Sequence, residues 1–147
     1  MQIKSLGHVV LKVRNLDRSL TFYRDILGMK EVARLRNTMV FFSFGNNHHD
    51  LALLQIGEMA SSPAADSVGL YHVAFKIGDS LDELRMLKHH LELHKVPILG
   101  SSDHAVSQSL YIQDPDGIEI ELYVDADPSV WRDNPAAMTT LKPLRLE

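Results

Sequence analysis

The sequence contains no cysteine. This excludes disulfide bonds and thiolate metal sites, and it fits a reducing compartment such as the cytoplasm. Residues 1–7 lack the apolar core of a secretory signal, and no apolar run approaches the roughly 20 residues that a membrane-spanning helix needs. The sequence therefore predicts a soluble cytoplasmic protein that does not act on membranes.

Clusters of basic residues are absent as well. The 15 Lys and Arg residues against 19 Asp and Glu residues give a formal net charge of −4, which offers nucleic acid no obvious binding surface. The length of 147 residues is that of one ordinary domain, and the hydrophobic fraction of 45% is usual for globular proteins. Among the residues that are present, the eight histidines stand out.

A short pattern occurs twice. Residues 7–13 read Gly-His-Val-Val-Leu-Lys-Val, and residues 71–77 read Tyr-His-Val-Ala-Phe-Lys-Ile. In both copies a histidine comes second, apolar residues come third and fifth, and a lysine comes sixth. Because apolar and polar residues alternate, each copy predicts a strand with one buried face. The recurrence predicts two similar modules.

Each repeated strand is followed by signals for a helix and further strands. The first helix is expected at residues 16–27, between an Asn15 cap and a Gly28 stop, and the second opens with a capping box of Ser80 and Glu83 and ends at Val96. Further strands are expected at residues 39–44, 51–56, 109–113 and 118–124, with weaker ones around 31–36 and 97–99. The prediction is an α+β fold with two βαβββ modules in one domain. The modules span about residues 5–59 and 69–125, with a linker at 60–68 and a tail at 126–147.

Three polar residues lie on strand faces opposite apolar ones. His8 and His72 hold equivalent positions in the repeat, and Glu121 alternates with Ile120 and Leu122. The apolar faces must cover the helices, so the faces that carry these three residues should line a shared polar groove. Two imidazoles and one carboxylate match the ligand set of non-haem Fe(II) oxygenases. One histidine alone would more simply be a solvated strand residue, but the recurrence favours a metal site.

These residues resemble the vicinal oxygen chelate superfamily, which includes glyoxalase I, fosfomycin-resistance proteins, bleomycin-binding proteins and type I extradiol dioxygenases. The resemblance covers residues 5–125, including Asn-Leu-Asp-Arg-Ser-Leu-Thr-Phe-Tyr at residues 15–23. It implies paired modules whose sheets curve around a metal-binding cleft, and a homodimer. Many extradiol enzymes have a second pair of modules, whereas the resemblance here covers one pair.

Within the superfamily, the sequence is most similar to small catechol 2,3-dioxygenase-like proteins. The matching residues are His49, His104 and Tyr111, together with the Asp-Pro-Asp-Gly turn at residues 114–117 that precedes Glu121. The resemblance implies Fe(II), or alternatively Mn(II), as the metal, and a catechol-type diol and O2 as substrates. It also implies that His104 takes up diol protons, that His49 manages protons on the oxygen species, and that Tyr111 orients the substrate.

Three alternatives remain open. Glyoxalase I has a fourth ligand, a glutamate, where this sequence has Ala52, and Gln55 lies outside that motif. A metal-dependent thiol transferase would use the same three ligands, usually with Mn(II), and Lys12 and Lys76 on the ligand faces suit its anionic substrate, but His49 and His104 would have no role. A drug-binding module without catalysis generally lacks the three ligands.

Overall fold

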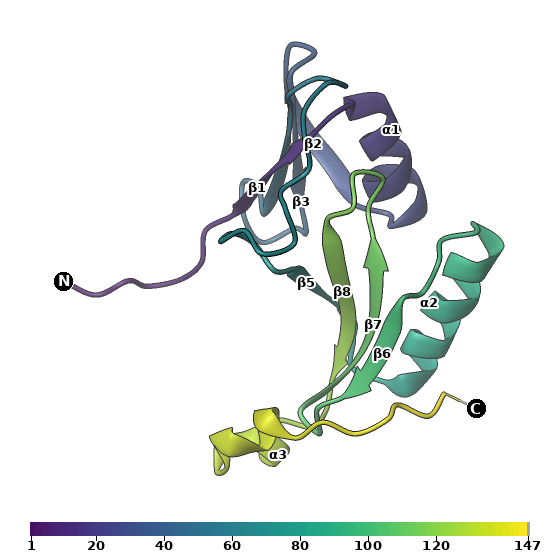
Figure 1. Cartoon of the computed structure of the whole chain (residues 1–147). Helices are drawn as coiled ribbons and strands as arrows, with labels where there is room; N and C mark the ends of the chain where they lie inside the picture. The colour runs from purple at the N-terminus through teal and green to yellow at the C-terminus, as the bar shows by residue number, and fades with distance from the viewer. Residues whose placement is uncertain (147) are drawn as a thin grey trace. The chain divides into compact units, whose positions relative to one another are not determined.

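The computed structural model describes residues 1–146. The chain divides into two compact units, of which unit 1 is Met1–Ala65 and unit 2 begins at Asp66. Each unit contains one four-stranded mixed sheet and one main helix (Figure 1). In the part of the chain that the structure describes, no helix has both the length and the apolar character that crossing a membrane requires.

Unit 1 is a βαβββ module. Its strands are Val9–Val13 (β1), Lys30–Leu35 (β2), Met39–Ser43 (β3) and Leu51–Gln55 (β4), in the sheet order β1-β4-β3-β2. β1 and β4 are parallel, and the other neighbours are antiparallel. The helix between β1 and β2 is α-helical over Leu16–Leu20 (α1) and π-helical over Thr21–Ile26 (η1).

Unit 2 repeats this order. Its elements are Val73–Gly78 (β5), Leu81–Leu93 (α2), Gly100–Asp103 (β6), Ser107–Gln113 (β7) and Glu119–Asp125 (β8), in the sheet order β5-β8-β7-β6. Two short helices follow, Ser129–Arg132 (α3) and Pro135–Thr139 (η2). The prediction of two βαβββ modules is confirmed. The weakly predicted strand around residues 97–99 begins later, at Gly100.

The helix boundaries follow the capping residues of the sequence. The Asn15 side chain accepts a hydrogen bond from the Arg18 amide at 3.0 Å, and Gly28 ends the first helix with a φ of 73°. At α2, Ser80 accepts from the Glu83 amide at 3.3 Å, and the Glu83 carboxylate accepts from the Asp79 amide at 2.9 Å. The Ser80 hydroxyl therefore satisfies an amide that the first turn of α2 leaves without a helical partner, and the Glu83 carboxylate binds the amide just before the N-cap.

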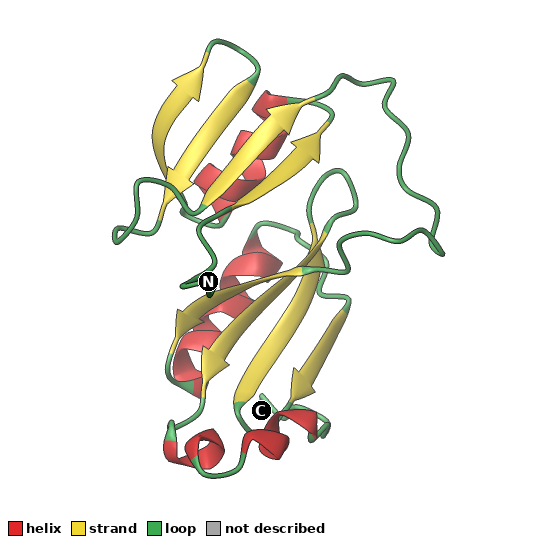
Figure 2. Ribbon diagram, turned by 90° about the vertical axis from the view of Figure 1, so that its left-hand side faces the viewer, coloured by secondary structure: helices red, strands yellow, loops and turns green. Residues whose placement is uncertain are grey.

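In each unit the helix covers the apolar face of the sheet (Figure 2). Leu11 and Val13 on β1 are 4% and 1% exposed, whereas Val10 between them is 44% exposed. On β8, Ile120 and Leu122 are buried in the same manner. The alternation predicted from the sequence is therefore present, and it leaves the opposite face of each sheet for the predicted site residues.

Candidate metal centre

His72 and Glu121 lie next to each other in unit 2. His72 immediately precedes β5, and Glu121 lies in the middle of β8, where it pairs in register with Ala74 of β5. The Nε2 atom of His72 is 3.0 Å from the Oε2 atom of Glu121. The Glu121 side chain is only 12% exposed and that of His72 is 28% exposed. Two of the three predicted ligands are thus in contact and partly shielded from water.

The second carboxylate oxygen of Glu121 also has a partner, the hydroxyl of Ser109. Its Oε1 atom accepts a hydrogen bond of 2.5 Å from the hydroxyl of Ser109, a buried residue of β7. Tyr111, two residues along the same strand face, pairs in register with Glu121 and shares a hydrogen bond of 3.0 Å with the Ser102 hydroxyl. Because one oxygen is bound to Ser109, the carboxylate presents the other to His72.

Burial raises the pKa of the Tyr111 phenol, and the negative charge of Glu121 raises it further. A phenol whose pKa lies above its usual value of about 10 is protonated at neutral pH. Its ring centroid is 6.0 Å from that of His72. Tyr111 therefore offers a hydroxyl next to the two predicted ligands.

The other ring nitrogen of His72 faces a second carboxylate. Its Nδ1 atom is buried, makes no hydrogen bond, and lies 3.5 Å from an oxygen of Glu119. Histidines that bind metals commonly direct their free ring nitrogen at a carboxylate. Here the Glu119 carboxylate lies in that position beside Nδ1 of His72.

An open pocket of about 410 Å³ lies beside these residues in unit 2. Three of its lining residues, His72, His104 and Tyr111, belong to the set predicted from the sequence. The remaining lining residues are Tyr71, Leu99, Gly100 and Glu119. Residues separated by up to 48 positions, from Tyr71 to Glu119, therefore share one cavity, because β5 to β8 form one sheet.

In unit 1, His8 lies against His49. Their ring centroids are 4.2 Å apart, and His49 also contacts the edge of Phe41. His49 lies in the loop before β4, and Asn47 of the same loop donates a hydrogen bond of 2.8 Å to the carbonyl of Gly7. Burial lowers the pKa of His49, and the neighbouring His8 and His48 lower it further. A predicted ligand and a predicted catalytic residue thus meet in unit 1.

The position of the fourth glyoxalase ligand carries no carboxylate. Ala52 is fully buried and pairs in register with Val10 and Phe41. The side-chain oxygen of Gln55 accepts a hydrogen bond of 2.8 Å from the Leu16 amide, so it caps the start of α1. Neither residue is arranged to supply an additional metal ligand.

The predicted ligands are divided between the units. His72 and Glu121 belong to unit 2 and His8 to unit 1. Among residues 1–146, no three histidine, aspartate or glutamate side chains form a group able to hold a metal ion. Within unit 2, His72 and Glu121 are in contact, with Nε2 and Oε2 3.0 Å apart.

The observed pair fits a divalent ion. Two neighbouring ligands of an octahedral ion, each bonded at roughly 2.1 Å, lie about 3 Å apart. The distance between Nε2 of His72 and Oε2 of Glu121 is 3.0 Å. Imidazole nitrogen and carboxylate oxygen are also the donors that non-haem Fe(II) sites use. His72 and Glu121 are therefore able to share one ion.

Four residues that support the site were not assigned roles from the sequence. Ser109 bonds Glu121, Ser102 bonds Tyr111, and Glu119 faces His72. The fourth, Thr140, accepts a hydrogen bond from His104 through its main-chain carbonyl. Alternation places Ser109 on the face of Tyr111, and Glu119 on that of Glu121, so these two were open to prediction. No local pattern indicates the contacts of Ser102 and Thr140.

Comparison with known proteins gives the family. The model of the Glyoxalase/Bleomycin resistance protein/Dioxygenase superfamily matches residues 5–122. The chain belongs to this superfamily, as its sequence predicted.

Similar proteins within the superfamily differ in activity. A catechol-2,3-dioxygenase of Bacillus subtilis (strain 168) is 35% identical over 92% of this chain and 47% of its own length. A biphenyl-2,3-diol 1,2-dioxygenase of Rhodococcus globerulus is 33% identical over 81% of this chain and 62% of its own length. The chain thus spans about half to two thirds of these dioxygenases. A lactoylglutathione lyase of Neisseria meningitidis serogroup A is 30% identical over 79% of this chain and 87% of its own length.

Solved structures support the fold. A glyoxalase/dioxygenase from Nostoc punctiforme has a TM-score of 0.70 and 22% identity, covering 84% of this chain and 92% of the other. Two curved four-stranded mixed sheets with helices are therefore the vicinal oxygen chelate fold.

Proposed function

We propose that this protein is an Fe(II)-dependent extradiol dioxygenase that opens the ring of a catechol-type diol, with His8, His72 and Glu121 as metal ligands. The observation that carries the proposal is the pocket that collects His72, His104 and Tyr111. His104 can accept a hydrogen bond and Tyr111 can donate one, and both line the same pocket as His72. This arrangement suits a substrate with two adjacent hydroxyl groups.

The residues of the chain have separate tasks in this reaction. Fe(II), when bound, supplies the sites at which the diol and O2 meet and the route by which electrons pass between them. His104 accepts a proton from one diol hydroxyl. Tyr111, which is protonated, donates a hydrogen bond to a diol oxygen and orients the ring. His49 transfers a proton on the oxygen side, and Ser109 keeps the Glu121 carboxylate in place.

Two observations favour this activity over its relatives. The buried methyl group of Ala52 stands where a lactoylglutathione lyase would need a fourth ligand. Lys76, which would suit the anionic substrate of a thiol transferase, is already bound to Asp79 at 2.5 Å and Asp125 at 2.8 Å. Hydrogen bonds, first to Asp125 and then to Asp79, raise the pKa of Lys76. Its ammonium group is therefore already paired with these two carboxylates.

The test is anaerobic reconstitution with Fe(II), followed by metal analysis and O2 uptake with a panel of catechols. We expect about one iron per chain, and one O2 consumed for each diol opened. The variants His72→Ala and Glu121→Ala should lose the iron and lower ring cleavage by more than about 100-fold, because each removes a ligand. His8→Ala should have the same effect as His72→Ala if His8 completes the set.

His89→Ala is the matched control, because it removes an exposed histidine from α2, outside the site. It should retain both iron and activity. Bound metal without O2 uptake on any diol would contradict the proposal and favour a lyase or transferase. Failure to bind metal would leave a binding module without catalysis.

We further propose that the protein forms a homodimer in the cytoplasm. Light scattering of the iron-loaded protein should give twice the mass of the chain. A mass equal to that of one chain would contradict this proposal and leave the assignment of the active site untouched.

A further inference from the structure

His104 lies in a tight turn between β6 and β7. Its amide donates a hydrogen bond of 2.9 Å to the carbonyl of Ser107. The carboxylate of Asp103 accepts hydrogen bonds from the Ala105 amide at 2.8 Å and from the Gln108 side chain at 3.2 Å. Ala105 has a φ of 66°, a backbone conformation unfavourable for a residue with a side chain. The turn therefore depends on contacts from its surroundings.

Part of that support comes from the C-terminal segment. Lys142 pairs antiparallel with Asp103: the Asp103 amide donates to the Lys142 carbonyl at 3.0 Å, and the Lys142 amide donates to the Asp103 carbonyl at 2.8 Å. Figure 1 shows the segment running from α3 past the turn between β6 and β7. The edge strand β6 thus gains an additional main-chain partner where the turn begins.

The same segment is attached at its other end. The Ala126 amide donates a hydrogen bond of 2.9 Å to the carbonyl of Val106. Side chains of the segment also lie against β7 and β8, around a pocket of about 310 Å³. This pocket is lined by Trp131, Pro135 and Met138 from the segment and by Val106, Ser107, Tyr123 and Asp125 from the sheet and its turn. Residues 126–142, which we call the C-terminal strap, are thus held at both ends.

Between these attachments, the strap contacts the His104 ring. The Nδ1 atom of His104 is 3.0 Å from the main-chain carbonyl oxygen of Thr140. A carbonyl oxygen can only accept, so Nδ1 must carry the hydrogen. In a neutral imidazole the other nitrogen, Nε2, is then an acceptor. His104 lines the pocket that contains His72 and Tyr111, so the strap determines which nitrogen can act there as a base.

We propose that the C-terminal strap is a positioning element of the active site, in which the Thr140 carbonyl fixes His104 as a proton acceptor through Nε2. The catalytic meaning of this contact rests on the proposed ring cleavage, whereas the contact itself does not. In that reaction the diol hydroxyl loses its proton to Nε2. The resulting imidazolium keeps its Nδ1–H bonded to the Thr140 carbonyl. The dipole of that carbonyl then stabilises the positive charge on the ring.

The experiment compares two substitutions at one residue. Lys142→Pro removes the N–H that donates to Asp103, whereas Lys142→Ala removes the exposed side chain and keeps both main-chain bonds. A third protein that ends at Met138 lacks Thr140 and Lys142 altogether. Nitrogen-15 NMR of the histidine rings in metal-free protein reports which nitrogen carries the hydrogen, and His104→Asn identifies the His104 signals.

In the natural protein and in Lys142→Ala, we expect His104 to be protonated at Nδ1. In the shortened protein its signals should move to the mixture of tautomers of an unrestrained imidazole, and Lys142→Pro should move them in the same direction. A structural role of the strap that did not involve the ring would leave the tautomer unchanged. Protonation at Nε2 in the natural protein, or an unchanged tautomer in the shortened one, would overturn the proposal.

Kinetics of the iron-loaded proteins give the second measurement. We expect kcat of the shortened protein to fall by roughly 10- to 100-fold with a smaller change in KM, because misplacing a general base affects the proton transfer more than substrate binding. Equal kcat values in the natural and shortened proteins would contradict the catalytic part of the proposal. If the natural protein opens no diol, the proposed function fails, while the tautomer measurement still decides whether the strap orients His104.

Discussion

A single hydroxyl group orients the side chain of Glu121, one of the three proposed metal ligands. Its carboxylate has two oxygens, and the Ser109 hydroxyl binds one of them at 2.5 Å while the other faces His72. Ser109 is fully buried, so water does not compete for this hydrogen bond. The hydrogen bond therefore restricts the carboxylate to one orientation.

Replacing Ser109 should weaken metal binding without removing a ligand. In Ser109→Ala the Glu121 carboxylate is free to rotate and loses one partner, and we expect the affinity for Fe(II) to fall by roughly 10-fold, as for other groups that orient metal ligands. Anaerobic titration with Fe(II) measures this. Ser107→Ala, on the same strand and face, is the matched control. Equal affinities in the two variants would show that Ser109 does not orient Glu121.

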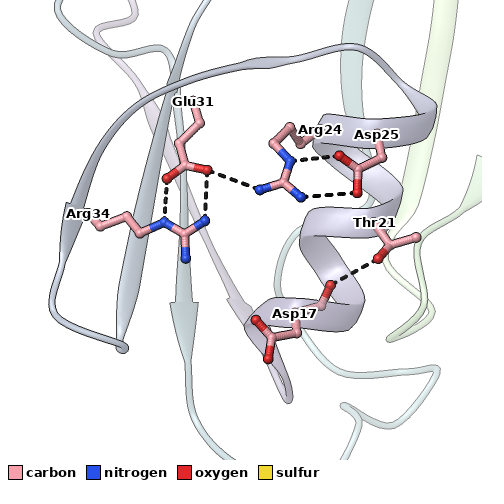
Figure 3. A network of polar contacts seen from close by, with 6 residues as sticks. All are labelled: Asp17, Thr21, Arg24, Asp25, Glu31 and Arg34. Carbon is pink, nitrogen blue, oxygen red and sulfur yellow. Dashed lines mark hydrogen bonds and ion pairs between the residues drawn. The ribbon is translucent and has the colours of Figure 1, made fainter.

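At the scale of elements, a β-bulge in β2 places residues of the sheet of unit 1 where they form ion pairs with each other and with the helix. The pairing of β2 with β3 shifts between Glu31 and Ala33, which adds one residue to β2. In a regular strand, residues 31 and 34 would lie on opposite faces because they are an odd number of positions apart. The bulge brings Glu31 and Arg34 to the same face, where they form an ion pair. Figure 3 shows that Arg24 of η1 joins the pair and also binds Asp25.

This network should make the stability of unit 1 depend on pH. Arg34 first, and then Arg24, lowers the pKa of Glu31 from its usual 4.5. A carboxyl whose pKa is lower in the folded state stabilises it above the unfolded pKa, and this contribution disappears as the pH falls through the folded pKa. The advantage of the natural protein over Glu31→Gln should therefore be constant above about pH 4.5 and shrink below it.

Urea denaturation over a series of pH values measures this difference. We expect it to be small, below about 1 kcal/mol, because both arginine partners of Glu31 lie at the surface with side chains 40% and 41% exposed, and to decrease with added salt. Asp66→Asn, in the exposed connection after unit 1, is the control. A difference that does not change between pH 7 and pH 3 would exclude the network as its source.

Gly78, at the end of β5, leaves space for the side chain that caps α2. A Cβ atom at this position would overlap the carboxylate of Glu83, which caps the helix by accepting from the Asp79 amide and the Ser80 hydroxyl. The strand thus ends on a residue without a side chain because the capping carboxylate occupies that space.

At the scale of the whole molecule, the connection between the units is exposed throughout. Every residue from 61 to 70 is exposed, and none belongs to a helix or strand. Exposed connections without regular structure are where proteases cut first. We expect brief digestion with a protease of broad specificity to cut within residues 61–70, which mass spectrometry of the fragments identifies. First cuts within β1 to β4 or within β5 to β8 would contradict this expectation.

Much of the fold could be predicted because its signals are local. The repeat containing His8 and His72 predicted two modules, and the alternation in β8 placed Glu121 on the face opposite Ile120. Caps and turn residues gave the helix ends, since they act within one turn. The strand expected around residues 97–99 begins at Gly100, where pairing in register with β7 starts. Of the expected residues, Leu99 donates a main-chain hydrogen bond of 2.8 Å to Tyr111 of β7, at the edge of the strand.

The supporting contacts of the site were decided by tertiary structure. His49 lies before β4, not within it, so strand alternation did not govern its direction, and the loop brings it against His8. Thr140 reaches His104 across 36 positions of sequence. The sequence by itself determined the two modules and the faces of their strands on which His8, His72 and Glu121 lie, because alternation and capping act between near neighbours. The hydrogen bonds that orient those residues depend on how strands and the C-terminal strap pack, which only the folded chain specifies.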